Sequence, residues 1–274
     1  MPTLDIGPDD ALYYEWTPPS TPDAVSFVFV NPITGDTGIW NADTVPAVIA
    51  AGHGALVYDF RGQGQSRYAP ERALDEALIV ADLERIVAHV APARPVFVGL
   101  SIGGLYAARA ILNGMHASGL VLINTLRRMT PRVEWMNAAT LRAMEVGGPN
   151  LMKDLYFHLI LGEQFQAANR SAFLADEPDY APLDPASGAY NLLTWMGKTS
   201  WDLDWSTIQT PTLVLTGLQD RVFYDAANVD ALARSMPNAQ RRDMADAGHM
   251  VPVEQPEAFA EAILGFARGL GTTA

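Results

Sequence analysis

Cysteine is absent from this chain of 274 residues. Its absence excludes disulfides, thiolate zinc sites and thiol nucleophiles. Basic residues are few, since 18 lysines and arginines compare with 31 aspartates and glutamates and the net charge is −13. A chain this acidic is a poor partner for phosphate backbones and anionic membranes. We therefore expect neither a nucleic-acid partner nor a membrane partner.

Long hydrophobic runs are also missing. The most apolar stretch, residues 95–112, contains Ser101, three glycines and Arg109, so it does not match a transmembrane helix. The first ten residues lack a basic start followed by an apolar core, so we expect no signal peptide and, by default, a cytoplasmic location. The hydrophobic content of 49%, with nine tyrosines and six tryptophans, indicates a packed globular protein.

Segments typical of strands and helices alternate over the first 125 residues, which predicts a mainly parallel sheet covered by helices. The expected strands are 12–17, 25–31, 55–60, 95–100 and 119–124, and the expected helices are 42–51, 74–90 and 102–114. The alternation returns with strands at 211–217 and 240–244 and helices at 225–236 and 256–269.

Between these two parts, residues 126–208 offer no comparable strand. They contain helical stretches at 133–146 and 150–161. We interpret residues 1–125 and 209–274 as an α/β core and residues 126–208 as a helical insertion. It would lie above the carboxyl edge of the sheet, where open α/β folds place their ligand crevices.

The segment from Pro95 to Gly104 runs from an apolar strand through Gly-Leu-Ser-Ile-Gly into a helix of small residues. A nucleophile elbow requires this context, with a serine on a sharp strand-to-helix turn. Gly99 and Gly103 leave room where the turning backbone approaches a neighbouring strand. The alternative is that Ser101 merely caps the helix that begins at Ile102.

A serine nucleophile needs a base to take its proton. His249 lies in a loop of small residues, Ala245 to Pro252, after the last predicted strand. The loop is placed to return an imidazole to the carboxyl edge of the sheet. For the other histidines, surface or packing roles are expected: His53, His89, His116 and His158.

The base needs an acid that orients it. Asp220 is best placed, because it lies just beyond the preceding strand. An ion pair with Arg221 is the alternative role for this carboxylate. Asp243 and Asp246 are also near the histidine, but the first falls within the final strand and the second at its end. Asn124, which follows another strand, offers no carboxylate.

With Ser101, Asp220 and His249 in this chain order, the sequence resembles the α/β-hydrolase superfamily, in particular its compact bacterial esterase, enol-lactonase and haloperoxidase-like branch. The segment Asp59 to Ser66 is similar to the family's DxRGxGxS loop, and Asp82-Leu83 fits the helix before the elbow. The resemblance covers nearly the whole chain. It implies an α/β-hydrolase fold, with a mainly parallel central sheet flanked by helices.

The same resemblance implies a helical lid between the sixth and seventh core strands, which residues 126–208 match. It also implies that the backbone N–H groups of Ile33 and Ile102 hold the oxyanion. The loop that carries the first donor begins Asn31-Pro32 in place of the usual His-Gly. Proline lacks an N–H and fixes its own φ, so this loop is expected to differ in shape. A tight turn alone is its alternative role.

Candidate substrate contacts lie in this loop and in the insertion. Thr34 is one, and Trp135 and Trp195 are two more. The insertion is rich in large apolar side chains, including Trp135, Met136, Met144, Met152, Trp195, Met196, Trp201 and Trp205. Most are expected to pack the insertion on the core, and any that face Ser101 would favour an apolar substrate. Structural roles are expected for Asp59, Arg61 and Gly62.

The sequence therefore predicts a serine hydrolase that cleaves a small to medium, largely apolar carboxylic ester or lactone through an acyl-enzyme on Ser101, without a cofactor or metal. Its expected partner is a small-molecule substrate. Acyl transfer, perhydrolysis and carbon–carbon bond hydrolysis use the same triad and stay open. So does a ligand receptor on the same scaffold. A serine at this position argues against dehalogenases and epoxide hydrolases with an aspartate nucleophile. The glycine-rich segments lack a P-loop lysine, which argues against nucleotide binding. The sequence leaves the oligomeric state open.

Overall fold

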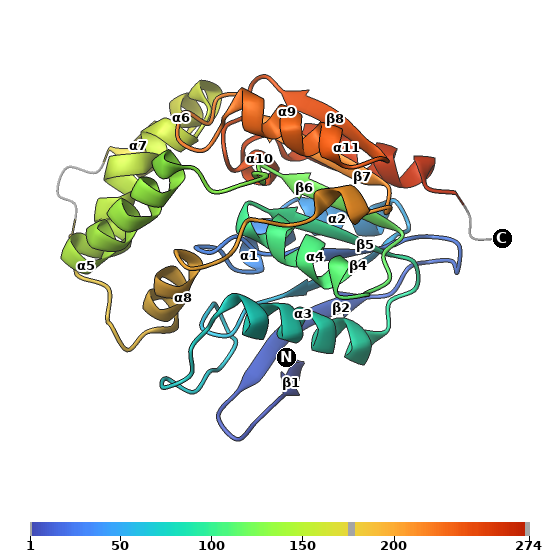
Figure 1. Cartoon of the computed structure of the whole chain (residues 1–274), viewed down its shortest axis with the longest axis horizontal. Helices are drawn as coiled ribbons and strands as arrows, with labels where there is room; N and C mark the ends of the chain where they lie inside the picture. The colour runs from blue at the N-terminus through green and yellow to red at the C-terminus, as the bar shows by residue number, and fades with distance from the viewer. Residues whose placement is uncertain (1, 175–178, 272–274) are drawn as a thin grey trace.

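A computed structural model describes residues 2–174 and 179–271, and a sheet of eight strands lies at its centre. The strands are β1 (Thr3–Asp5), β2 (Ala11–Thr17), β3 (Ser26–Val30), β4 (Gly54–Tyr58), β5 (Pro95–Leu100), β6 (Gly119–Ile123), β7 (Thr212–Gly217) and β8 (Ala239–Met244). Their order across the sheet is β1-β2-β4-β3-β5-β6-β7-β8 (Figure 1). β2 pairs antiparallel with β1 and with β4, and the other neighbours are parallel. The predicted mainly parallel sheet is confirmed.

Helices cover both faces of the sheet (Figure 1). One face carries α3 (Glu76–Val90), α4 (Ile102–Leu112) and α9 (Ala226–Ser235), and the other carries α1 (Gly38–Asn41), α2 (Thr44–Ala50), α10 (Val251–Glu254) and α11 (Pro256–Gly269). Successive strand side chains point to opposite faces. In β5, Phe97 packs in the cluster under α3 and α4, whereas Val96 and Val98 pack in the cluster under α11. Burial on both faces explains why β3, β4, β5, β6 and β7 are mostly apolar, whereas the edge strands β1 and β8 are not.

The chain between β6 and β7 forms the helical insertion. Its helices are α5 (Pro131–Ile160), α6 (Glu163–Ala168), α7 (Arg170–Phe173) and α8 (Gly188–Met196), followed by the short 3-10 helix η1 (Trp205–Thr207). The two helices predicted in this region are the two halves of α5, which kinks at Gly148, where φ is +66°, just before Pro149. α5, α6 and α7 lie together beyond one end of the strands (Figure 1).

The predicted core elements are found, each with ends within about two residues of those expected. The sequence did not indicate the short elements β1, α1, α6, α7, α8 and α10. Among the helices of the described ranges, none combines the length and the apolar character that crossing a bilayer requires.

Candidate active site

Ser101 lies on the turn from β5 into α4, with φ +57° and ψ −121°. Residues other than glycine adopt such a conformation only where the surroundings enforce it. The Ser101 N–H donates to the Ile123 carbonyl at 2.7 Å, and the Thr125 hydroxyl donates to the Ser101 carbonyl at 2.9 Å. A Cβ atom on Gly103 would come within 2.4 Å of the Val30 carbonyl oxygen, so glycine is required there. The Ser101 side chain makes no capping hydrogen bond to α4, so the helix-cap alternative is wrong.

His249 and Asp220 are brought together from loops after β8 and β7. The imidazole Nδ1 lies 2.6 Å from the Asp220 Oδ2, and both residues are buried. Asp220 Oδ1 accepts the backbone N–H groups of Val222 at 3.0 Å and Phe223 at 2.9 Å, which fixes the carboxylate. With a proton on Nδ1 facing the carboxylate, the Nε2 atom is left as the basic nitrogen.

The competing acids and the competing partner lie elsewhere. Arg221 pairs with Glu163 of α6 at 2.8 Å, so the alternative of an ion pair within the loop is wrong. Asp243 pairs with Arg241 at 2.7 Å, and Asp246 is exposed. Among the described residues, the carboxylate that contacts the His249 imidazole is that of Asp220, in the loop after β7.

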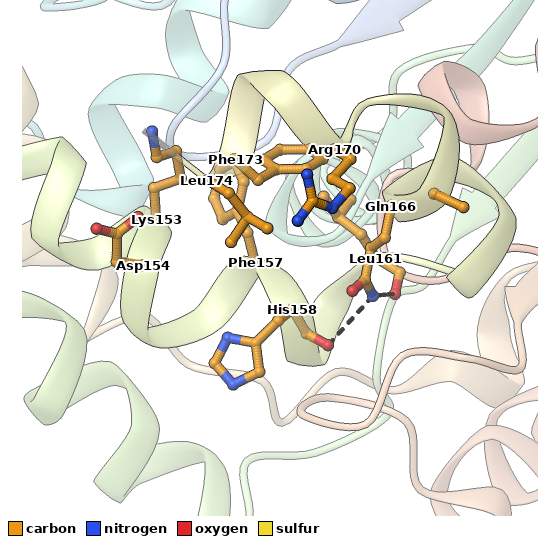
Figure 2. A pocket seen from close by; sticks show the side chains of 10 residues that line it. Lys153, Asp154, Phe157, His158, Leu161, Gln166, Arg170, Phe173 and Leu174 are labelled. Carbon is orange, nitrogen blue, oxygen red and sulfur yellow. Dashed lines mark hydrogen bonds between the residues drawn. The ribbon is translucent and has the colours of Figure 1, made fainter. Parts of the chain in front are cut away.

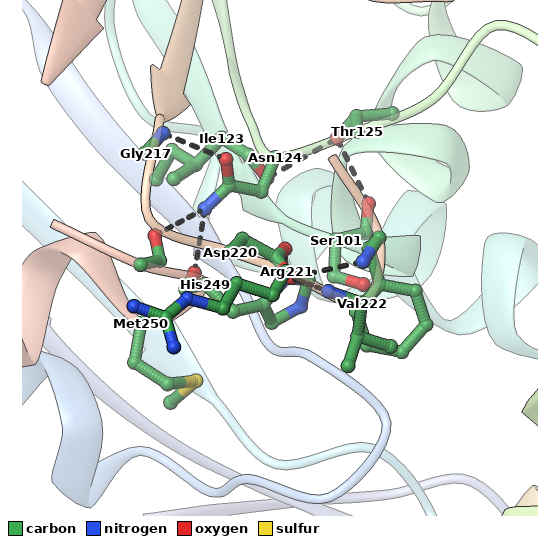
Figure 3. A network of polar contacts seen from close by, with 12 residues as sticks. Ser101, Ile123, Asn124, Thr125, Gly217, Asp220, Arg221, Val222, His249 and Met250 are labelled. Atoms are coloured by element: carbon green, nitrogen blue, oxygen red, sulfur yellow. Dashed lines mark hydrogen bonds and ion pairs between the residues drawn. The ribbon is translucent and has the colours of Figure 1, made fainter. Parts of the chain in front are cut away.

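Asn124 ties the loops of this edge together. Its Oδ1 accepts the Gly217 N–H at 2.9 Å, and its Nδ2 donates to the carbonyl oxygens of Gly248 at 3.1 Å and His249 at 2.7 Å. Figure 3 shows the amide between these groups, with Ser101 and Asp220 close by. Sequence reasoning noted only that Asn124 lacks a carboxylate and missed its amide. Its position directly after a buried strand was the available signal.

Gln63 shapes the loop that carries Ile33. Its Nε2 donates to the carbonyl oxygens of Pro32 at 2.8 Å and Ile33 at 3.0 Å. Within the described residues, the N–H groups of Ile33 and Ile102 donate to no other group. The two expected oxyanion donors are therefore available, despite the proline. Gln63 occupies a variable position of the Asp59 to Ser66 motif, and no sequence signal marked it.

Asn31, which replaces the usual histidine, is fully buried. Its Oδ1 accepts the indole N–H of Trp40 at 2.7 Å, and its Nδ2 donates to the Tyr58 carbonyl at 3.1 Å. A longer contact of 3.3 Å joins Nδ2 to the Gln63 Oε1. The Asn31 amide thus anchors the start of the loop in the core. It also connects the loop to Gln63, which bonds to the carbonyls of Pro32 and Ile33.

The Asp59 to Ser66 loop is held by buried charges. Arg61 forms two hydrogen bonds of 2.6 Å with Asp82 and an ion pair of 3.1 Å with Asp10. Asp59 accepts two backbone N–H groups, while its burial raises its pKa above the ordinary value. These contacts are structural, as expected for this loop.

Apolar side chains of the insertion pack with core residues near the site in two clusters. Ile33 packs in a cluster with the buried residues Met144, Met152 and Leu193. The Phe223 ring lies 4.7 Å from the His249 ring, and Phe223 belongs to a second cluster with Met136 and Met250.

A cavity of about 780 Å³ lies within the insertion, between α5 and the α6–α7 segment (Figure 2). Phe157, Leu161 and Phe173 line it and belong to the same apolar cluster as Phe223. His158 and Arg170 contribute to its wall. The cavity wall therefore shares an apolar cluster with Phe223, the residue whose ring contacts His249.

The three candidate substrate contacts lie in the Ile33 loop, on α5 and on α8. Thr34 is exposed in the Ile33 loop, and Trp135 is 75% exposed on α5. Trp195 lines a groove against α3, with the Lys198 ammonium 3.9 Å above its ring centre. No hydrogen bond or ring contact of the described residues joins them to Ser101. No group of three or more His, Asp or Glu side chains placed to hold a metal ion occurs in the described ranges.

The alpha/beta hydrolase family matches residues 27–262. The chain is 31% identical over 222 residues to the polyketide synthase ThaQ of Burkholderia thailandensis. The aligned region covers 78% of this chain but only 10% of that protein. It is 24% identical to 3-oxoadipate enol-lactonase 1 of Acinetobacter baylyi over 90% of both chains. A thermophilic esterase from Thermogutta terrifontis has the same fold, with a TM-score of 0.80, 24% identity, and coverage of 99% of this chain and 97% of that one. The chain therefore belongs to the α/β-hydrolase family and is a hydrolase.

Proposed function

We propose that the protein is a serine hydrolase that cleaves a small to medium, largely apolar carboxylic ester or lactone through an acyl-enzyme on Ser101. One observation carries the proposal. A strained turn presents Ser101 at the sheet edge where His249 is held 2.6 Å from the buried carboxylate of Asp220. A nucleophile, a base and an orienting acid are what acyl transfer requires.

The first half-reaction joins Ser101 to the acyl group. The Ser101 Oγ attacks the carbonyl carbon while its proton passes to the Nε2 of His249, and Asp220 stabilises the imidazolium that results. When the tetrahedral intermediate collapses, the carbon–oxygen bond to the leaving group breaks. The leaving alkoxide takes the proton from Nε2, and an ester bond to Ser101 remains.

Water completes the cycle. The Nε2 of His249 accepts a proton from water as its oxygen attacks the acyl carbon, and Ser101 then leaves with that proton. In both tetrahedral intermediates, the N–H groups of Ile33 and Ile102 would meet the negative oxygen. The Gln63 contacts support this role, because they turn the carbonyls of the first loop away and leave its N–H unused.

The surroundings favour an apolar substrate. Ile33 with its methionine neighbours borders one side of the site, and Phe223 with Met250 borders the other. Sites for small molecules are mostly apolar with a few placed polar groups. The named lactonase among the relatives supports the lactone part of the proposal, not the apolar character of the substrate. We propose that the insertion is the lid over this site.

The test is turnover of p-nitrophenyl esters of increasing chain length, combined with labelling by a fluorophosphonate. We expect turnover and labelling in the wild type, and neither in Ser101→Ala. Ser118→Ala is the matched control, because Ser118 is also half-buried but precedes β6. Equal turnover in wild type and Ser101→Ala would exclude the nucleophile. A folded wild type with neither turnover nor labelling would point instead to a ligand receptor.

A further inference from the structure

Glu254 is a buried acid that the proposed reaction does not use. It ends α10, and only 7% of it is exposed. Its Oε2 accepts the N–H of Gly248 at 2.9 Å and that of Gly162 at 2.5 Å, while its Oε1 accepts the Met250 N–H at 2.8 Å. Gly248 and Met250 flank His249, whereas Gly162 belongs to the insertion. One carboxylate thus joins the histidine loop to the α5–α6 junction.

The main chain of His249 is held between the insertion and the core. Its N–H donates to the Ile160 carbonyl at 2.5 Å, and its carbonyl accepts the Asn124 amide at 2.7 Å. One residue earlier in α5, the Leu159 carbonyl accepts the Arg221 N–H at 2.8 Å, next to Asp220. The end of α5 therefore bonds to both loops that supply the base and its acid.

The backbone of the histidine loop packs closely against the α5–α6 junction. A Cβ atom on Gly248 would come within 2.1 Å of the Ile160 carbonyl oxygen, and one on Gly162 would come within 2.9 Å of the Asp246 carbonyl oxygen. Backbones this close move together. A shift of the α5–α6 junction would therefore displace the loop that carries the imidazole.

The contacts of Glu254 fit the ionised carboxylate. All three partners are N–H donors, and a carboxylate only accepts. Burial raises the pKa of Glu254, while these three N–H groups lower it in part. No lysine or arginine of the described residues forms an ion pair with it. Its charge is therefore met by the backbone donors of the insertion and of the histidine loop.

We propose that Glu254 is a positioning residue, which aligns His249 by fastening its loop to the α5–α6 junction of the insertion. The inference rests on the proposed role of His249 as the base. With this contact, the insertion helps to position the triad, in addition to its proposed role as a lid. A misplacement of about 1 Å at a reacting group lowers a rate by about 100-fold.

The test compares Glu254→Gln and Glu254→Ala with Glu257→Gln, an exposed glutamate in the first turn of α11. The glutamine keeps an oxygen for Gly162 and Gly248 but turns its NH2 group toward the Met250 N–H. We expect kcat for p-nitrophenyl butyrate, per site titrated with fluorophosphonate, to fall about 10-fold in Glu254→Gln and about 100-fold in Glu254→Ala. KM should stay nearly constant, and Glu257→Gln should match the wild type.

A purely structural role would give a different result. Glu254→Ala would then lose titratable sites or melting temperature, while kcat per titrated site stayed at the wild-type value, and the proposal would be overturned. If the alanine variant does not fold, the isosteric Glu254→Gln decides. An unchanged kcat per site in that variant would also overturn it.

A second readout does not depend on turnover. The short Nδ1–H bond to Asp220 should give a strongly downfield proton resonance, and the amides of Gly162 and His249 should be protected from hydrogen exchange. We expect Glu254→Gln to broaden or shift this resonance and to speed exchange at both amides, with no such change in Glu257→Gln. An unperturbed resonance and unchanged exchange would contradict the inference. If Ser101 never reacts in the wild type, the proposed function fails while this readout still tests the alignment.

Discussion

Gln63 holds Ile33 by its carbonyl oxygen, with the side-chain Nε2 at 3.0 Å. The same nitrogen reaches the Pro32 carbonyl at 2.8 Å. These bonds point two successive carbonyls toward the Asp59 to Ser66 loop. A loop that begins Asn31-Pro32 therefore keeps an unused N–H at Ile33, although the proline contributes none.

The Gln63→Met variant tests this relationship. Methionine has a similar length but no donor, so the two carbonyls lose their partner and the loop loses its fixed orientation. Removal of one oxyanion donor typically lowers kcat by about 100-fold to 1,000-fold. An indirect loss of orientation should approach the lower end, with a smaller change in KM. Steady-state kinetics should show the lower kcat, and the affinity for a trifluoromethyl ketone inhibitor should fall with it.

The matched control for this variant is Gln164→Met, because Gln164 is exposed on α6. Its kinetics should equal those of the wild type. If Gln63→Met kept both wild-type kcat and wild-type inhibitor affinity, Ile33 would not be an oxyanion donor held by Gln63.

Asp220→Asn should be far more damaging than Asp243→Asn. An amide at position 220 still accepts the N–H groups of Val222 and Phe223 but no longer favours the Nδ1–H tautomer of His249. The same type of change lowers kcat by about 10,000-fold in a serine protease triad. Asp243 pairs with Arg241 on the surface, so its amide variant should keep wild-type kcat. Comparable losses in the two variants would remove Asp220 from its assigned role.

Much of the fold was predictable because β5, β6 and β7 are buried on both faces and α3 and α11 have one apolar side each. Such patterns depend on local sequence alone. β1 has three residues that are largely exposed, and α6 and α7 bury none of their residues completely, so they carry little apolar periodicity. Their existence depends on contacts with distant elements.

The site divides in a similar way. Ser101, Asp220 and His249 could be singled out because each follows a predicted strand. Gln63 bonds to the carbonyls of Pro32 and Ile33, and Glu254 joins its own loop to Gly162, so both reach main-chain groups that are remote in sequence. Neither side chain differs in kind from a surface residue.

Trp135 shows the opposite difficulty. A count of apolar residues in α5 does not say which side chains turn inward, and the structure leaves three quarters of this indole exposed.

Gly103→Ala should destabilise the elbow. The added Cβ would lie 2.4 Å from the Val30 carbonyl oxygen and 2.5 Å from that of Asn31, and neither backbone atom can yield without moving β3. Overpacking of this kind costs about 1–3 kcal/mol. Gly265→Ala in α11 is the control, because its Cβ would have no neighbour nearer than 3.5 Å. That variant should gain about 0.5–1 kcal/mol from helix propensity. Urea denaturation that ranked the two variants in the opposite order would refute the tight fit of the elbow.

Asp59 should contribute a fall in the free energy of unfolding as the pH rises above the ordinary pKa of its carboxyl. Burial raises the pKa of this carboxyl above its ordinary value of 3.8. Between the ordinary and the raised value, the folded state holds a proton that the unfolded state has released. The free energy of unfolding then declines with pH by up to about 1.4 kcal/mol per unit for one group. Below the ordinary pKa both states are protonated and the contribution is absent.

Asp59→Asn removes this titration. Relative to this variant, the wild type should therefore lose free energy of unfolding as the pH rises above 3.8, the ordinary pKa of the carboxyl. Glu254 contributes a decline of the same sign in both proteins, because burial also raises its pKa. The measurement is urea denaturation at a series of pH values, with Asp9→Asn as the control at an exposed aspartate. The control should keep the wild-type slope. Identical slopes in all three proteins would mean that Asp59 releases its proton at the same pH in the folded and unfolded states, and the buried carboxylate would then be fully compensated by the N–H groups of Thr37 and Gln65.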